Sequence, residues 1–245
     1  EWFFGGSTMI GTSQRDDHTI PSVVARLAEQ DGILIRPVNF GVESFNNYQE
    51  TLAFAGALAN EDRPDLVVFY DGANDVATAV ERVQVGRIDP GDVYYQAVSQ
   101  EEAAERTKAG SAPNLDEQAR DDLVIELGAA QYRRGVEIAR WLAKGAGVPI
   151  VHMWQPSVAS APPPEVARPL IGHLGLTDDG LEQVRTLFSG IRDRSGTDPV
   201  DLSSALAGVD EPTFFDFEHT NELGARVIAT AMYEQLHDEL EALDR

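Results

Sequence analysis

The fold is decided by residues 65–75, which have the sequence DLVVFYDGAND. Residues 65–70 form a nearly unbroken apolar run between Pro64 and Gly72. Such a run is typical of a strand that is buried on both faces, as in the parallel sheet of an α/β protein. The polar residue Asn74 lies just past the carboxyl end of this strand.

Other strands and helices are predicted on both sides of this segment. Apolar runs predict strands at residues 2–4, 33–40 and 149–154. Helical spacing of apolar residues predicts helices at residues 21–29, 48–58, 115–143 and 181–191, a short helical turn at 201–206, and a last helix from 221 to near the end. Because strands alternate with helices, we predict one three-layer α/β/α domain over residues 1–245 with a mainly parallel sheet.

Two stretches lack a clear repeating pattern. Residues 81–114 are mostly polar with poor periodicity, so we expect an insertion that could act as a lid. The prolines at 162–164 predict an extended loop after the fourth strand. A short apolar stub at residues 213–215 ends at Asp216.

The composition narrows the classes of partner. Acidic residues outnumber basic ones by 41 to 19, for a formal net charge of −22. Nucleic-acid binding needs clustered Lys and Arg, so a nucleic-acid partner is not expected. The negative field favours neutral or cationic substrates over anionic ones. The chain has no cysteine, which excludes disulfides and thiolate metal sites.

No stretch of the sequence approaches the length of apolar residues that a membrane helix requires. The chain opens without Met, directly into the apolar residues Trp2, Phe3 and Phe4. We therefore expect a bacterial extracytoplasmic protein, secreted or anchored, from which an N-terminal segment has been removed. The sequence carries no signal for an oligomeric state.

Four polar segments occupy positions at the ends of predicted strands or before the last helix, where open α/β sheets bind ligands. They are Gly5-Gly6-Ser7-Thr8, Asn39-Phe40-Gly41, Gly72-Ala73-Asn74-Asp75 and Asp216-Phe217-Glu218-His219. Taken singly, each has an ordinary structural explanation, because Gly, Ser, Asn and Asp are common in turns and at helix N-caps. Their combination in this order is more informative than any one segment.

In this order the segments resemble the signature blocks of the SGNH hydrolases, also called GDSL esterases and lipases, over nearly the whole chain. Gly6-Ser7-Thr8 is similar to the block that carries the nucleophile, Gly41 to the second block, and Gly72-Ala73-Asn74-Asp75 to the Gly-x-Asn-Asp block. The last block, Asp-x-x-His followed by Asn and Gly, is matched by Asp216, His219, Asn221 and Gly224. The chain departs from the family pattern at Gly6, where Asp is usual, and at Glu43-Ser44, where Ser-Gly is common.

The resemblance implies a flavodoxin-like sheet and a Ser-His-Asp triad. Ser7 would be the nucleophile, His219 its general base, and Asp216 the carboxylate that orients the imidazole. The oxyanion hole would consist of the backbone amides of Ser7 and Gly41 and the side-chain amide of Asn74. This chemistry needs no metal and no cofactor.

At the end of the fourth strand, topology alone suggests that Gln155 lines the pocket. We expect a serine hydrolase of acyl or acetyl esters on a small molecule or a carbohydrate. Two alternatives stay open, an acyltransferase that moves the acyl group to a sugar hydroxyl, and a catalytically inert envelope or carbohydrate-binding module.

Overall fold

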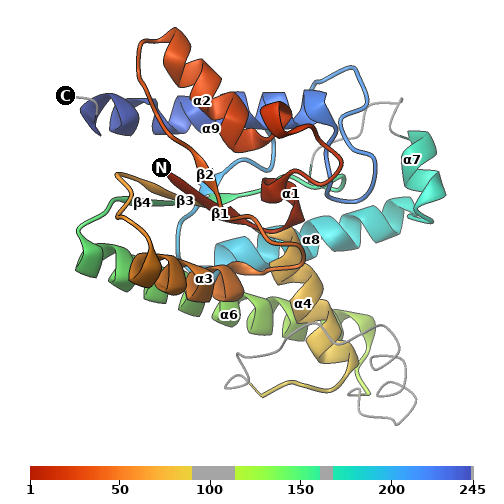
Figure 1. The fold of residues 1–245 in the computed structure, drawn as a ribbon. Coiled ribbons are helices and arrows are strands. Elements are labelled where there is room, and N and C mark those ends of the chain that lie inside the picture. The colour runs from red at the N-terminus through yellow and green to blue at the C-terminus, as the bar shows by residue number, and fades with distance from the viewer. Residues whose placement is uncertain (90–113, 161–167, 244–245) are drawn as a thin grey trace.

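The computed structural model describes residues 1–89, 114–160 and 168–243 (Figure 1). A five-stranded sheet with strand order β2-β1-β3-β4-β5 forms its centre. The strands are β1 (Trp2–Gly5), β2 (Val38–Asn39), β3 (Val67–Asp71), β4 (Ile150–Trp154) and β5 (Val200–Asp201). All four strand pairings are parallel. This is the flavodoxin-like order, so the predicted fold class is confirmed.

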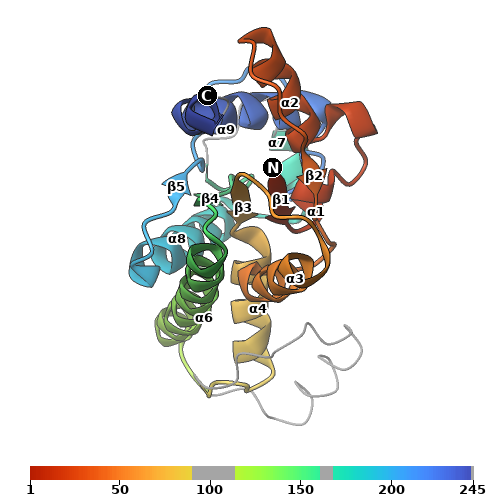
Figure 2. The ribbon, with the colours of Figure 1, turned by 60° about the vertical axis from the view of Figure 1, so that its left-hand side comes forward.

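Helices cover both faces of the sheet (Figures 1 and 2). They are α1 (Ser7–Ile10), α2 (Ile20–Gln30), α3 (Asn47–Asn60), α4 (Ala73–Gln84), α6 (Glu117–Ala146), α7 (Arg168–His173), α8 (Asp178–Ser195) and α9 (Glu222–Leu243), with a short 3₁₀ helix at Asp16–His18. Helices α2 and α9 pack on one face, and α3, α4, α6 and α8 lie on the other.

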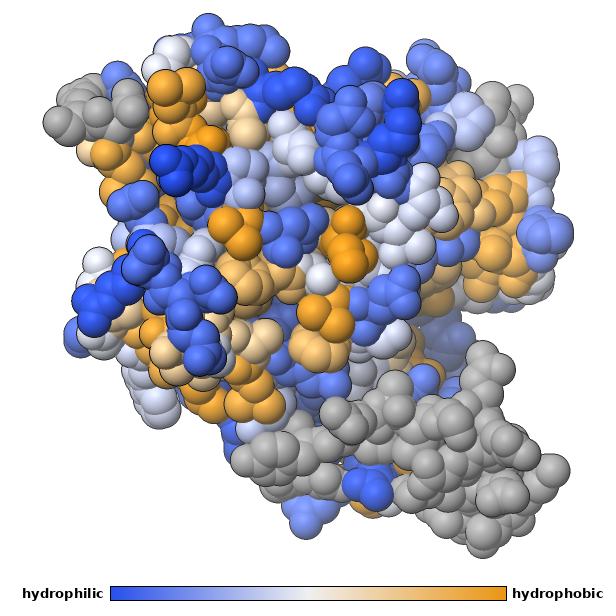
Figure 3. Space-filling view, viewed as in Figure 1, coloured by the Kyte–Doolittle hydropathy of each residue, from blue (hydrophilic) through white to orange (hydrophobic). Residues whose placement is uncertain are grey.

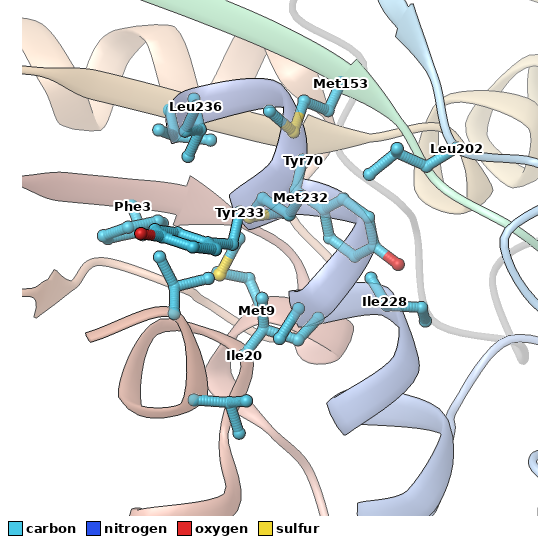
Figure 4. Packing of buried hydrophobic residues seen from close by; sticks show 14 of the residues in the cluster. Phe3, Met9, Ile20, Tyr70, Met153, Leu202, Ile228, Met232, Tyr233 and Leu236 are labelled. Atoms are coloured by element: carbon cyan, nitrogen blue, oxygen red, sulfur yellow. The ribbon is translucent and has the colours of Figure 1, made fainter. Parts of the chain in front are cut away.

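The alternation of side chains along β1 and β3 explains why both faces need cover. Phe3 and Tyr70 pack with α2 and α9 (Figure 4), whereas Phe4 and Phe69 point to the opposite face and stack with ring centroids 5.1 Å apart. Successive side chains of a strand point to opposite faces. Each fully buried large apolar side chain stabilises the fold by roughly 1.5–3 kcal/mol.

The strand order places a topological switch point between β1 and β3. The chain passes from β1 to β2 on one side, then returns past β1 to reach β3 on the other side. The carboxyl ends of β1 and β3 therefore lie side by side, with Gly5 paired in register with Tyr70. Ligands of open α/β sheets bind at such a point, because the connecting segments separate there.

Several elements differ from the sequence-based predictions. Of the strand predicted at 33–40, only Val38–Asn39 pairs with the sheet. Pro37 lacks an amide hydrogen and restricts the residue before it, which keeps the earlier part out of the ladder. The predicted helical turn at 201–206 is wrong, because Asp201 ends β5 and residues 203–208 form successive turns and not a helix.

Among the described residues, the α-helices that were not predicted are α1, α4 and α7, and the 3₁₀ helix at Asp16–His18 was not predicted either. Helix α4 includes residues 81–84, so the predicted insertion at 81–114 begins inside a helix. Residues 90–113, the main part of that predicted lid, lie outside the described residues, as do the prolines at 162–164.

The described helices contain no segment that is both long and apolar enough to cross a bilayer. Hydrophilic residues cover much of the face shown in Figure 3, and apolar residues gather at its right-hand side, where Figure 1 places α7.

Candidate active site

Ser7 is held at the junction between β1 and α1. It is the first residue of α1, and only Gly6 separates it from the end of β1. The carbonyl oxygen of Gly6 accepts the amides of Met9 and Ile10 at 3.1 Å each. The Ser7 side chain is buried but reaches the loop before α9, where its Oγ lies 2.6 Å from Nε2 of His219. The two residues are 212 positions apart in the sequence.

Asp216 binds both the ring and the backbone of the His219 segment. Its Oδ2 lies 2.6 Å from Nδ1 of His219, and its Oδ1 accepts the backbone amides of Glu218 and His219 at 3.0 and 2.7 Å. With the proton on Nδ1, the ring donates to Asp216 and leaves Nε2 free to accept the Ser7 hydroxyl proton. Asp216 thus closes the turn and orients the imidazole at the same time.

A small β-bridge keeps this turn in place ahead of α9. Phe214 pairs with Thr220, and the amide of Phe215 donates to the carbonyl oxygen of His219 at 3.1 Å. The Phe215 ring stacks on the His219 ring, with centroids 5.6 Å apart. Asn221 then accepts the amide of Gly224 at 3.0 Å and so caps α9.

Asn74 brings its side-chain amide close to Gly6, the residue before Ser7. It is the second residue of α4, which begins after Gly72 at the end of β3. A Cβ atom added to Gly6 would lie 2.2 Å from Nδ2 of Asn74. The absence of a side chain at position 6 therefore makes room for this amide next to Ser7.

Gly41 packs tightly against α1, but its amide is already bonded within its own loop. A Cβ atom at Gly41 would lie 2.4 Å from the backbone nitrogen of Ile10. The Gly41 amide donates to Oδ1 of Asn39 at 2.9 Å, and Nδ2 of Asn39 donates to the carbonyl oxygen of Met9 at 2.8 Å. Asn39 was not assigned a role from the sequence, although its position at the end of a predicted strand was a signal.

A pocket of about 490 Å³ lies beside His219. It is lined by Ala73, Val76, Ala77, Val80, Glu81, Leu174, Val184, Leu187, Phe188, Asp216, Phe217, Glu218 and His219. Its size is in the usual range for small-molecule sites. Gln155, predicted to line the pocket, is not among these residues. Its buried side chain instead accepts the Thr8 hydroxyl at 3.3 Å, because Gln155 follows β4 underneath α1.

Two glutamates stand among the apolar walls of the pocket. Glu218 Oε1 lies 4.0 Å from Nε2 of His219, and burial raises the pKa of the Glu218 carboxyl, although His219 acts in the opposite direction. Glu81 lies farther along α4, and burial raises its pKa as well. Neither glutamate was singled out by the sequence pattern.

A buried cluster of acidic side chains, Glu50, Asp71 and Asp75, lies next to the first turn of α4. Asn47 donates its backbone amide to Asp75 at 3.2 Å and its side-chain amide to Asp71 at 2.8 Å. Burial, together with the charge of Asp71, raises the pKa of both Glu50 and Asp75 well above the ordinary range. The Asp75 residue of the Gly-x-Asn-Asp motif thus ties α4 to α3 rather than facing the pocket.

Comparison with known proteins gives structural matches across almost the entire chain, although no family model and no curated protein matches the sequence. The lipase Lip_vut3 from a goat rumen metagenome aligns with a TM-score of 0.57 at 9% identity, covering 95% of each chain. The esterase EstA from Pseudoalteromonas sp. aligns with a TM-score of 0.52 at 12% identity, covering 98% of this chain and 97% of the esterase.

A variant of Axe2, an acetyl xylan esterase from Geobacillus stearothermophilus, aligns with a TM-score of 0.50 at 14% identity, covering 96% of this chain and 93% of the esterase. The chain has an SGNH-like fold. At these identities the likeness establishes the arrangement of strands and helices, and the roles of individual residues depend on the geometry given above.

None of the other described histidines is among the residues that line the pocket. His152 is buried in β4, stacks on Phe69 at 4.8 Å, and lies 3.8 Å from Asp71. Burial lowers the pKa of its imidazole, which favours the neutral form. Within residues 1–89, 114–160 and 168–243, no three His, Asp or Glu side chains are grouped so that they could hold a metal ion.

Proposed function

We propose that this protein is a serine ester hydrolase of the SGNH type. The observation that supports this proposal is the continuous hydrogen-bonded series from Asp216 through His219 to Ser7, with both side-chain contacts at 2.6 Å. A serine hydroxyl is a weak nucleophile near neutral pH, so it needs an adjacent base that is itself held by a third group. The series supplies both.

In the first half of the proposed reaction, Nε2 of His219 takes the hydroxyl proton while Oγ of Ser7 attacks the ester carbonyl carbon. Asp216 stabilises the imidazolium that forms. The carbonyl oxygen becomes an oxyanion, which would receive hydrogen bonds from the backbone amide of Ser7 and from Nδ2 of Asn74. First-turn amides of a helix have no partner within the helix and point toward such an anion.

Gly41 is the third proposed oxyanion donor. Its amide would have to turn from Oδ1 of Asn39 toward the oxyanion, or divide its hydrogen bond between the two acceptors. Asn39 would therefore compete with the substrate for this donor, and the other two donors form the core of the proposed oxyanion hole.

The first half ends when His219 gives its proton to the departing alcohol and leaves Ser7 acylated, and the second half hydrolyses this acyl-enzyme. A water molecule, activated by His219, then attacks the acyl carbon and releases the acid. An alcohol in place of water would give acyl transfer through the same intermediate. The size of the pocket favours esters with an apolar chain over plain acetyl esters as substrates.

Labelling with a fluorophosphonate tests this proposal directly. The probe should modify the protein at a single site that peptide mapping assigns to Ser7, and Ser7→Ala should abolish the labelling. Ser204→Ala, which changes an exposed serine, should leave it intact. An unlabelled wild-type protein would instead support the inert binding module. Product analysis with and without added sugar or alcohol acceptors separates hydrolysis from transfer.

A further inference from the structure

The pocket beside His219 contains the carboxyl group of Glu81, which has no role in the proposed reaction. Glu81 lines this pocket, and its buried Oε2 atom has no hydrogen-bond partner among the residues that the structure describes. A buried carboxylate oxygen without a partner is costly, so such an atom calls for an explanation. Apart from Glu81, the residues of α4 and α8 that line the pocket are all apolar, so their side chains offer it no donor.

Glu81 lies at the opposite end of the pocket from the proposed oxyanion hole. The lining residues of α4 are Ala73, Val76, Ala77, Val80 and Glu81, which recur at helical spacing and form one face. Ala73 precedes Asn74, the proposed oxyanion donor. From Ala73 to Glu81 the helix rises by about 12 Å, at 1.5 Å per residue. A chain that extends from the reacting carbonyl along α4 would therefore end near Glu81.

The walls between these two ends are apolar. Leu187 and Phe188 of α8 face the α4 residues, and Leu174 follows α7. Only a group that donates a hydrogen bond would satisfy Glu81 after an aliphatic chain has filled this part of the pocket. An anionic group there would be repelled by Glu81 and by the net charge of −22.

We infer that Glu81 is a specificity-determining residue, which makes the enzyme prefer esters whose acyl chain carries a hydroxyl or a protonated amine toward its far end. This inference rests on the proposed ester hydrolysis. The acyl chain is assigned to the pocket because it stays attached to Ser7 through both half-reactions, whereas the alcohol must leave after the first. A pocket with an apolar lining therefore stabilises the bound acyl chain in both half-reactions.

Glu218 provides the comparison within the same pocket. It lies at the catalytic end, 4.0 Å from Nε2 of His219, so its carboxyl adjoins the reacting groups and not the end of the chain. A donor at the far end of the acyl chain would meet Glu81, and the preference for that donor should depend on Glu81 alone.

The test is a set of p-nitrophenyl esters with acyl chains of equal length, unsubstituted or carrying a terminal hydroxyl, amine or carboxylate. For the wild-type protein, kcat/KM should be higher for the hydroxyl and amine esters and lowest for the carboxylate ester. In Glu81→Leu the preference for a donor over the unsubstituted chain should fall by about tenfold or more, the effect of one hydrogen bond to a charged group.

Two further variants make the result specific. Glu81→Gln, which keeps the shape of the side chain but not its charge, should lose preference for the amine more than for the hydroxyl. Glu239→Gln, at an exposed glutamate of α9, should change neither ratio. The unsubstituted ester and the fluorophosphonate label at Ser7 report whether each variant is folded and reactive.

The failure of this inference and the failure of the proposed function give different results. If Ser7 is labelled and esters are cleaved, but Glu81→Leu keeps the wild-type ratio, the role of Glu81 is wrong. The same conclusion follows if the preference appears only when the hydroxyl or amine is placed on the alcohol arm of acetyl esters. If no ester is cleaved and Ser7 is not labelled, the proposed function itself is wrong.

Discussion

Nδ2 of Asn74 occupies the space in which a side chain of residue 6 would begin, 2.2 Å from the position of a Cβ atom on Gly6. Gly6 is also where this chain departs from the usual Asp of the first SGNH block. In this chain the glycine leaves the space that the asparagine amide occupies. Changes at position 6 should act on catalysis through Asn74.

Gly6→Ala is expected to lower kcat by about 10²-fold or more, because the new methyl group displaces the Asn74 amide and one oxyanion donor is lost. KM and the melting temperature should change little, since the Asn74 side chain can move aside. Asn74→Ala should lower kcat to a similar extent. The kcat of the double variant Gly6→Ala/Asn74→Ala should be close to that of either single variant. Gly56→Ala, where an added Cβ meets nothing within 4 Å, is the control. Additive losses in the double variant would contradict the coupling.

The proposed triad of Ser7, His219 and Asp216 predicts unequal losses of activity. Ser7→Ala and His219→Ala should each lower kcat by roughly 10⁶-fold, and Asp216→Ala by roughly 10⁴-fold, since the acid orients the imidazole and does not react. His237→Ala is a matched control, because His237 also lies beside an acid, with Nδ1 3.3 Å from Asp238, but on the surface of α9. Initial rates on one chromogenic ester measure all four variants. Equal, small losses for Ser7→Ala and His237→Ala would rule out the assigned nucleophile.

Glu50→Gln should stabilise the protein at high pH. The folded-state pKa of Glu50 is raised well above 4.5 by burial and by Asp71, so folding favours the protonated carboxyl. Its stabilising contribution is therefore fully present below about pH 4.5 and is lost as the pH rises through the folded-state pKa. The glutamine resembles the protonated acid and removes this loss.

Thermal melts at pH 4.5 and pH 8 measure this effect. The gain in melting temperature of Glu50→Gln over the wild type should be larger at pH 8. Glu61→Gln, at an exposed residue just after α3, removes one charge without burial and should show no such trend. An equal gain for both variants would mean that lower net charge, and not the buried carboxyl, is the cause.

Two glycines of α6 should respond in opposite directions to alanine. A Cβ atom at Gly135 would lie 2.1 Å from Oδ1 of Asn47, the residue that links α3 to Asp71. At Gly145 it would meet nothing within 4 Å. Gly135→Ala should therefore destabilise the fold by about 1–3 kcal/mol through overpacking, and Gly145→Ala should stabilise it by up to about 1 kcal/mol through helix propensity. Urea unfolding of both variants gives the two values, and a loss of stability in Gly145→Ala would be inconsistent with the open space there.

The fold could be predicted because its strands have strong local signals. The run at residues 65–70 and the helical stripe of α9 are apolar patterns that burial in a sheet or against it requires, and both elements form where expected. Strand β5 has only two residues, so its position depends on pairing with Met153 and Trp154 and not on its own sequence. Helix α1 is a single turn after β1, too short to leave a periodic pattern.

The pocket could not be predicted from the sequence to the same extent. Gln155 was placed in it by topology, but the side chain turns beneath α1 to Thr8. Glu81 lies in a stretch that seemed polar and irregular, and only the continuation of α4 through this residue puts its carboxyl in the pocket. The direction of the Glu81 side chain depends on its place in α4, and the apolar pattern around residue 81 does not predict a helix there.

By itself, the sequence determined the class of fold and the residue types available for chemistry, because strand and helix patterns follow from local side-chain periodicity. Tertiary structure alone decided which of these residues meet. Ser7 and His219 come from opposite ends of the chain, and their approach to 2.6 Å requires β1 and the segment before α9 to be packed against the same edge of the sheet. The position of the Glu81 carboxyl, whose Oε2 has no hydrogen-bond partner among the described residues, was likewise set by packing, whereas the bond between Gly41 and Asn39 joins residues only two positions apart and is local.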